Sequence, residues 1–248
     1  MGITNTRIDN ISNKLILFDP PRERATMSLE AIHLRKLIAI LYSSDSEQRT
    51  ALRSDIRHEL RKLQGAGKGG GDFHTPFWTD AKNHAAGIAN LGEQSKFRIE
   101  QNWRRKRLYP QLTNGFLSWW NEKRRWRNEP FEILSNSPKA QFEVPELDAV
   151  VKLENLLAFR IGDKENRIVY PYFSEVPILP DEGARLCIWL LGEALEDYKI
   201  EDMRILDVLR GKSFATIDVP LQGNEQELFI QKYDQVLKEW DKLRKEYD

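Results

Sequence analysis

The sequence changes character near residue 129, and this change constrains the fold more than any single motif. Before it, apolar residues recur at the three- and four-residue spacing of helices that bury one face; after Pro145, short β-branched runs alternate with turn residues. Charge divides at the same place, because residues 1–128 carry 23 Lys and Arg against 13 Asp and Glu, and residues 129–248 carry 15 against 25. A formally neutral chain is therefore a basic half joined to an acidic half, which indicates an anionic partner or docking between the halves.

The basic half is predicted to be helical. A first helix begins at an N-cap, Ser28, and a second covers residues 46–63 and ends before Gly65. Residues 76–109 form a helical region that Pro110 ends, and a further helix covers 111–127.

The acidic half mixes strands and helices. Two strand-like runs, 150–159 and 167–170, flank the turn residues 162–166, and Pro171 restricts the second strand to an edge or an exit from the sheet. The remaining elements expected are a helix over 181–197, strands over 203–209 and 214–217, and a closing helix over 224–247. We therefore expect an α+β fold, in which a helical N-terminal half precedes a small α/β region with a β-hairpin and a C-terminal helix.

Composition shifts divide the chain into four segments. They are an N-terminal helical region (1–64), a Gly-rich linker or loop (65–75), a basic/aromatic helical region (76–129) and an acidic α+β region (130–248). No run of about 18 apolar residues occurs, so no membrane partner is expected. The single cysteine, Cys187, lies in an apolar run, which predicts a core thiol in a reducing, cytoplasmic protein.

Motifs for catalysis and cofactor binding are missing from the sequence. The Gly-rich run lacks the spacing of a phosphate-binding loop, and His74, Asp80 and His84 are too few for a zinc site. Serine-nucleophile, metalloprotease and dinucleotide motifs do not occur. We expect no cofactor and no metal, and a non-enzymatic role is favoured over an enzymatic one.

Residues 96–127 combine ten Lys and Arg with only two acidic residues, Glu100 and Glu122, and interleave them with tryptophans. Cations neutralise phosphates and aromatic rings stack on unpaired bases, so this pattern predicts binding of DNA or RNA. The alternative is that Phe116, Trp119 and Trp120 form a core face, while the arginines pair with carboxylates of the acidic half or of a partner protein. The candidate nucleic-acid-binding residues are Trp103, Arg104, Arg105, Lys106, Arg107, Trp119, Trp120, Lys123, Arg124, Arg125, Trp126 and Arg127.

A second basic feature is the arginine row of the 46–63 helix. Four arginines recur every four residues and therefore share one helix face: Arg49, Arg53, Arg57 and Arg61. Like charges at this spacing repel, and only Asp45 is placed to pair with one of them inside the helix. The row predicts an anion or partner contact, either a carboxylate of the acidic half or a phosphate; the alternative is a solvated face.

A family resemblance covers about 100 residues from residue 111 onward, where the expected elements are a helix, a short strand, a hairpin, a helix and a strand. This order resembles the core of the PD-(D/E)XK nuclease fold, in its RecB-like branch. The resemblance implies a metal-binding carboxylate at Glu154 and a D/E-x-K triplet on the next strand, but that position reads Tyr170-Pro171-Tyr172. The helix segment 185–189 likewise lacks the glutamine of the family's Q-x-x-x-Y helix. The resemblance thus implies a non-catalytic descendant.

Three hypotheses follow. The first is a cytoplasmic, non-enzymatic protein that binds nucleic acid through its basic/aromatic region, as part of an assembly. The second is an interaction or scaffold component whose two halves dock on one another or join copies head to tail. The third is a divergent metal-dependent nuclease of the PD-(D/E)XK type.

Overall fold

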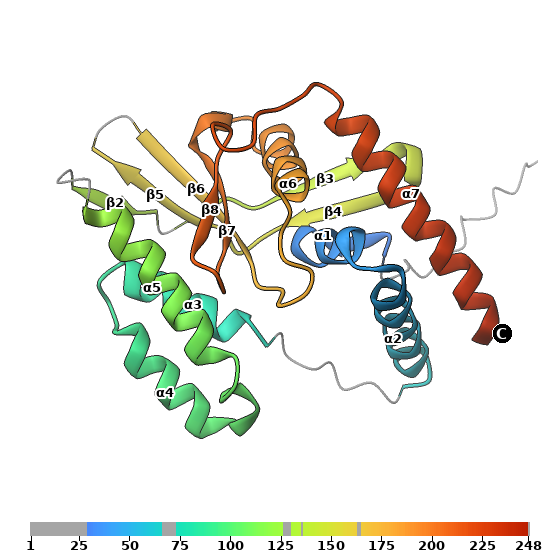
Figure 1. The fold of residues 1–248 in the computed structure, drawn as a ribbon, viewed down its shortest axis with the longest axis horizontal. Coiled ribbons are helices and arrows are strands. Elements are labelled where there is room, and N and C mark those ends of the chain that lie inside the picture. The colour runs from blue at the N-terminus through green and yellow to red at the C-terminus, as the bar shows by residue number, and fades with distance from the viewer. Residues whose placement is uncertain (1–28, 66–72, 126–129, 135, 163–164, 248) are drawn as a thin grey trace, which may run out of the picture.

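The computed structural model describes residues 29–65, 73–125, 130–134, 136–162 and 165–247. Its strands form two mixed sheets, and its main helices surround them (Figure 1). A three-stranded sheet has the order β1 (Ala31–His33), β4 (Ala149–Leu153) and β3 (Ala140–Val144). A five-stranded sheet has the order β2 (Phe131–Ile133), β5 (Leu157–Ile161), β6 (Glu165–Tyr172), β7 (Met203–Asp207) and β8 (Lys212–Phe214).

The helices fall into two groups. One group contains α1 (Leu34–Tyr42), α2 (Asp45–Leu63), α6 (Asp181–Ala194) and α7 (Glu225–Arg244). The other contains α3 (Thr75–Ala85), α4 (Leu91–Gln101) and α5 (Tyr109–Arg125), at the lower left of Figure 1. Short 3₁₀ turns are η1 (Trp103–Arg105), η2 (Pro145–Leu147), η3 (Ile200–Asp202) and η4 (Lys245–Tyr247). The α+β fold class and the C-terminal helix are confirmed. None of the helices in the described ranges is long and apolar enough to cross a membrane.

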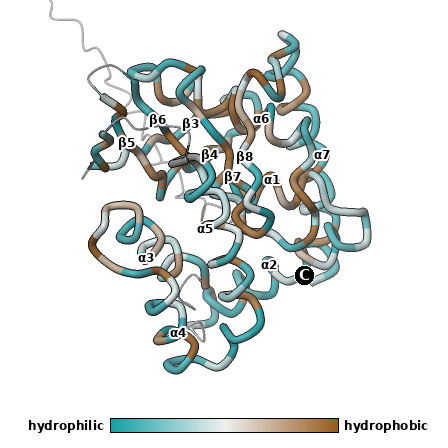
Figure 2. The backbone as a smooth tube through the Cα atoms, turned by 60° about the vertical axis from the view of Figure 1, so that its left-hand side comes forward, coloured by the Kyte–Doolittle hydropathy of each residue, from teal (hydrophilic) through white to brown (hydrophobic). Residues whose placement is uncertain are grey.

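Two apolar cores lie on opposite faces of the five-stranded sheet. Alternate residues of β6 point to opposite sides: Tyr170 joins the core made with α1, α2, α6 and α7, and Val169 joins the core made with α3 and α5. In Figure 2 brown, hydrophobic segments run along the strands and α6. The first core contains residues from Leu29–Ile56 and from Val144–Leu243, so residues 29–64 and the acidic region 130–247 share one apolar interior.

The first predicted helix is wrong at its start. Ser28 lies outside the described residues, Ala31–His33 form β1, and the helix begins at Leu34. β1 pairs in parallel with β4, with Ala31 opposite Val150. A short apolar run next to a helix carries no signal of its own, and here pairing with a distant strand overrides the helical periodicity.

Residues 76–109 are interrupted rather than continuous. Gly87 has φ +73°, a conformation that glycine adopts without cost, and it follows α3. Asn90 then caps α4 by accepting a hydrogen bond from the Glu93 N–H at 3.1 Å. Pro110 does not end a helix; it stands in the first turn of α5, where its missing N–H has no partner to lose.

Residues 150–159 hold two strands rather than one. β4 and β5 belong to different sheets, and the chain turns between them at Asn155, whose φ is +64°. Strand β3, which pairs with β4, was not predicted from the sequence. The β5–β6 hairpin is confirmed, and Pro171 lies where β6 has passed its last pair with β5 (Leu157 with Val169) and pairs with β7.

Candidate nucleic-acid interface

The tryptophans of α5 are buried, which corrects the prediction that they bind nucleic acid. Trp119 and Trp120 are 4% and 3% exposed. Phe116 stacks on Trp120 with ring centroids 6.2 Å apart, and the edge of Trp120 meets Phe131 of β2 and Phe159 of β5. Rings packed between a helix and a sheet cannot stack on bases, so the alternative, a core face, is correct for these residues.

The C-terminal part of the basic region is described only in its backbone, and only as far as Arg125. Lys123, Arg124 and Arg125 belong to α5, although their side chains are not described, and Trp126 and Arg127 lie outside the described residues. Their predicted role in binding remains a sequence prediction.

The η1 turn faces solvent. Trp103 is 77% exposed, and its neighbours Arg104 and Lys106 are exposed too. The turn is fixed by its own hydrogen bonds: the Asn102 side chain accepts from Arg104 N at 3.1 Å, and Lys106 N donates to Trp103 O at 3.0 Å. We define the η1 surface as Trp103, Arg104 and Lys106 of this turn together with Lys96, an exposed residue of the preceding helix α4.

Arg105 points toward the protein and anchors the turn. Its Nη1 donates to Arg98 O at 3.2 Å, and its guanidinium lies 5.3 Å from the centre of the Tyr109 ring. Tyr109 is fully buried and donates to Phe73 O at 3.0 Å. A partly buried arginine with these partners is held by the protein rather than presented to a ligand.

Helix α4, which precedes the η1 turn, is held to α3 by an ion pair. Arg98 of α4 donates to both carboxylate oxygens of Asp80 in α3, at 2.9 and 3.1 Å. Asp80 is buried, and its hydrogen bond holds the pKa of Arg98 above the usual value for arginine. The pairing joins α3 to α4 and places Asp80 apart from any histidine site.

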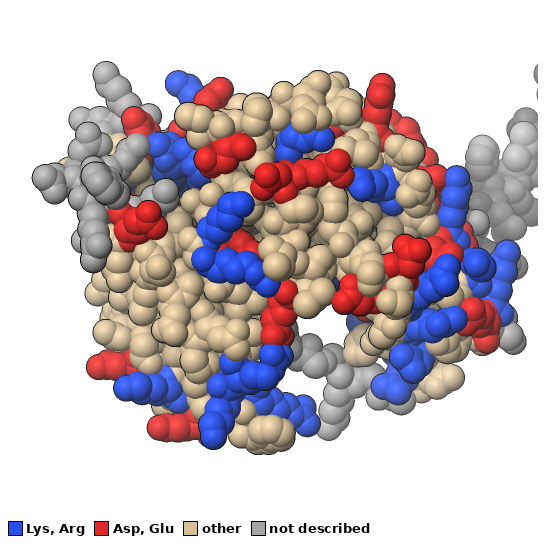
Figure 3. Space-filling view, viewed as in Figure 1, with Lys and Arg blue, Asp and Glu red and all other residues tan. Residues whose placement is uncertain are grey.

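Arg107 is exposed to solvent and also pairs with a carboxylate of the acidic half. It forms a bidentate pair with Glu175, in the loop after β6, and Nη2 lies 2.6 Å from Oε1. The hydrogen bond from Arg107 lowers the pKa of Glu175. The charge of Arg107 is thereby offset inside the protein, so the cations of the η1 surface are Lys96, Arg104 and Lys106. Figure 3 shows Lys and Arg gathered at the lower edge of the molecule, where α4 ends and α5 begins.

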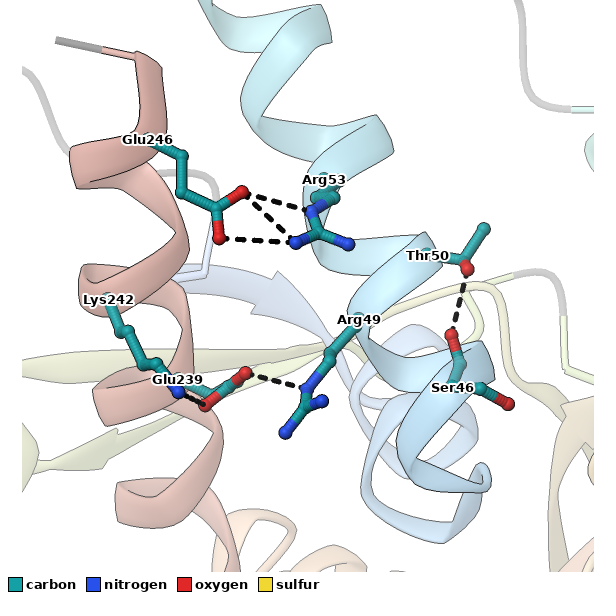
Figure 4. Close-up of polar contacts among 7 residues, drawn as sticks. All are labelled: Ser46, Arg49, Thr50, Arg53, Glu239, Lys242 and Glu246. Carbon is teal, nitrogen blue, oxygen red and sulfur yellow. Dashed lines mark hydrogen bonds and ion pairs between the residues drawn. The ribbon is translucent and has the colours of Figure 1, made fainter.

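The arginine row of α2 meets the acidic half of the chain at α7 and the η4 turn that follows it (Figure 4). Arg49 Nε donates to Glu239 at 2.9 Å, and Arg53 contacts both oxygens of Glu246 at 3.0 and 3.1 Å. Arg57 Nε donates to the Arg53 carbonyl at 3.2 Å, and both Arg57 and Arg61 are exposed. The first two arginines of the row thus contact carboxylates of the acidic half.

The triplet position that the predicted nuclease resemblance assigns to catalysis is filled by core residues, whereas Glu154 is partly exposed. Tyr170 and Tyr172 are each 1% exposed; the Tyr170 hydroxyl accepts from Arg35 N, and the Tyr172 hydroxyl donates to Pro177 O. Burial raises the pKa of both phenols. Glu154 lies 4.0 Å from His33. Within the described ranges, no three His, Cys, Asp or Glu residues are grouped so as to hold a metal ion.

The other residues singled out in the sequence are structural. Cys187 is buried, and burial raises its pKa, as expected for a core thiol. His74 stacks on Phe173, whereas His84 accepts from Leu91 N at 3.3 Å, so the two histidines have separate environments.

The sequence did not indicate which way each side chain of the η1 turn would point. Asn102 was the one available signal, because asparagine before a short polar run often caps a turn. No protein-family model matches the chain, and no curated protein matches it significantly.

Proposed function

We propose that the protein binds nucleic acid through the η1 surface and does not catalyse a reaction on it. The observation that carries the proposal is the exposure of Trp103, next in the chain to the exposed Arg104 and close in sequence to the exposed Lys106, on a turn that Arg105 anchors to α4. Lys and Arg side chains bind phosphates largely without regard to sequence, and an exposed indole adds a flat apolar contact.

The number of cations sets the expected strength of binding. Three of them, Lys96, Arg104 and Lys106, are exposed on the η1 surface. Neutralising about three phosphates gives a slope of log K against log salt of about −2 to −3, and affinities in the range of non-specific binding, about 10⁻⁴ to 10⁻⁶ M. Residues 123–127 would add to both quantities if they share the interface.

Two observations support the proposal of a nuclease-like protein without catalytic activity. One concerns the order of the elements, and the other concerns the triplet position. The elements α5, β2, β5, β6, α6 and β7 follow the order that the resemblance requires, with β3, η2 and β4 inserted after β2. The triplet position is occupied by the buried Tyr170 and Tyr172, neither of which can hold a divalent cation as a carboxylate does.

The test is a salt series of oligonucleotide binding with two charge-matched variants. Arg104→Gln with Lys106→Gln should lower affinity about tenfold and reduce the salt slope by about 2. Arg57→Gln with Arg61→Gln removes the same charge from α2, where both arginines are exposed, and should leave affinity nearly unchanged. No binding by the unmodified protein at low salt would overturn the proposal, as would equal losses in the two variants.

Replacing Arg124, Arg125 and Arg127 together tests the C-terminal part of the basic region separately. A further drop in affinity and slope would extend the interface along α5. An unchanged affinity would confine it to the η1 surface.

The scaffold hypothesis is supported in one form by the contacts of α2. Glu239 and Glu246 pair with arginines of their own chain, which favours docking of the two halves within one molecule over head-to-tail assembly. Light scattering at low and high salt tests this. A mass that rises with concentration and falls with salt would favour assembly between copies.

A further inference from the structure

We infer that the η1 surface selects single-stranded over double-stranded nucleic acid by stacking an unpaired base on Trp103. This inference rests on the proposed function and specifies its ligand. In a duplex both faces of each internal base are covered by neighbouring bases, whereas a single strand offers open faces to an aromatic side chain.

Trp103 differs from the other tryptophans that the structure describes. Trp78, Trp119, Trp120, Trp189 and Trp240 are all buried, and Trp103 alone of this set is exposed, at 77%. Phe97, on the last turns of α4, is a second exposed aromatic residue, at 51%. An exposed indole or phenyl ring leaves a large apolar surface in contact with water, which is unfavourable. A base stacked on the ring would cover part of that surface.

The indole is carried by a turn that needs little ordering on binding. The Asn102 cap and the Lys106 N–H to Trp103 O bond fix the backbone on both sides of the ring. Arg105 ties the same turn to α4 and to the buried Tyr109. A preorganised platform loses less entropy when a ligand binds, so more of the stacking energy appears as affinity.

Cations lie beside this platform in the chain. Arg104 directly follows Trp103, and Lys106 belongs to the same hydrogen-bonded turn. A nucleotide stacked on the indole therefore has its phosphates near two exposed positive charges, which is the combination used by single-strand binders.

Sequence selectivity should be low. Asn102 is the residue of the turn best suited to read base edges, but its Oδ1 accepts the capping hydrogen bond from Arg104 N. Stacking tolerates every base, because each has a π face, so we expect similar affinities for oligonucleotides of different sequence.

The experiment compares three probes of equal length: oligothymidylate, a mixed-sequence single strand and the corresponding DNA duplex. Trp103→Ala should weaken binding of both single strands by about 5- to 150-fold, as expected for the loss of one stacked base. Binding of the duplex and the salt slope should stay unchanged, because no charge is removed. Trp103→Phe should retain most of the single-strand affinity.

The matched control is Ile217→Ala, which removes an 88%-exposed apolar side chain from the loop after β8. It should leave all three affinities unchanged. Quenching of indole fluorescence by the single strand gives a second readout: it should be present in the unmodified protein and reduced in Trp103→Phe.

Failure of the inference and failure of the proposed function give different results. Equal affinity for single strands and duplex, unaffected by Trp103→Ala but lowered by Arg104→Gln with Lys106→Gln, would overturn stacking and leave phosphate binding standing. No affinity for any probe at low salt would overturn the proposed function itself.

Discussion

The η1 turn and the α5 helix are made of the same residue types, and the fold uses them in opposite ways. Both combine tryptophan with arginine or lysine within residues 96–127. In α5 the tryptophans are buried against the sheet, whereas in η1 the tryptophan is exposed and an arginine, Arg105, turns inward. Spacing rather than composition accounts for the difference, because Leu112, Phe116, Trp119 and Trp120 fall on one face of a helix.

The α2 helix extends this comparison. In the sequence, Asp45 is the one carboxylate three or four residues from an arginine of the row, yet Arg49 and Arg53 pair with carboxylates almost 200 residues away, on α7 and η4. An unpaired basic row in a sequence is thus a weak sign of an external anion. The η1 surface is a better candidate because its cations accompany an exposed aromatic ring.

The largest expected effect is on stability, and it tests whether Trp120 is buried and Trp103 is exposed. Trp120→Ala should lower the free energy of unfolding by about 3–5 kcal/mol, because it leaves a cavity between α5 and the sheet. Trp103→Ala should change it by less than about 0.5 kcal/mol, because the ring is exposed. Urea unfolding followed by circular dichroism measures both. Similar losses in the two variants would mean that Trp103 is packed and cannot act as a platform.

The next effect tests how closely α5 packs against the turn after β7. A Cβ added at Gly115 would lie 2.0 Å from the Val208 carbonyl oxygen and 2.8 Å from that of Leu209. Gly115→Ala should therefore destabilise the protein by about 3 kcal/mol, since backbone atoms must move to make room. Helix propensity alone predicts the opposite sign, a gain of about 1 kcal/mol.

Thermal denaturation decides the sign for Gly115→Ala. The control is Gly87→Ala, where the added Cβ meets nothing within 4 Å and the cost is the φ of +73°. A loss of about 1 kcal/mol is expected there. Stabilisation by Gly115→Ala would show that α5 lies farther from the turn after β7.

A smaller effect tests the contrast between α2 and η1. A double-mutant cycle on Arg53 and Glu246, both partly exposed, should give a coupling free energy of about 0.2–1 kcal/mol that shrinks in high salt. Arg57 with Glu246 serves as the reference pair and should give no coupling. A coupling that is absent for Arg53 as well would return the arginine row to the set of candidate ligand-binding surfaces.

The smallest effect concerns Arg107, at the border of the η1 surface. Because Arg107 lowers the pKa of Glu175, Arg107→Gln should raise that pKa toward the usual value for glutamate. The pair stabilises the folded state above the pKa of an unfolded glutamate, and this contribution is lost as pH falls through the lowered folded value. Carboxyl carbon NMR measures the shift, and Lys106→Gln is the control that should leave it in place.

Much of the fold followed from local patterns in the sequence. The apolar spacing of α2, α6 and α7 and the turn residues between β5 and β6 predicted those elements, because their signals lie within a few residues. β1 and β3 escaped prediction since their stability comes from pairing with β4 rather than from their own residues.

The candidate site was predicted in part. The basic/aromatic composition identified residues 96–127, yet it could not separate Trp103 from Trp119 and Trp120, because that depends on where the sheet lies. The inward direction of Arg105 depends on Tyr109 and on the Arg98 carbonyl, and the pairing of Arg107 depends on Glu175 in a distant loop. Long-range contacts of this kind are set by topology.

The parallel pairing of β1 with β4 has a consequence for synthesis of the chain. Ala31 and Val150 lie 119 residues apart, so at about 5–20 residues per second the ribosome makes β1 and the adjacent α1 roughly 6–24 s before it makes β4, the strand that pairs with β1. During that interval the apolar face of α1, with Leu34, Leu37, Ile38 and Leu41, has no sheet to cover it. The apolar face of α1 therefore waits for more than 100 further residues of synthesis before its sheet can form.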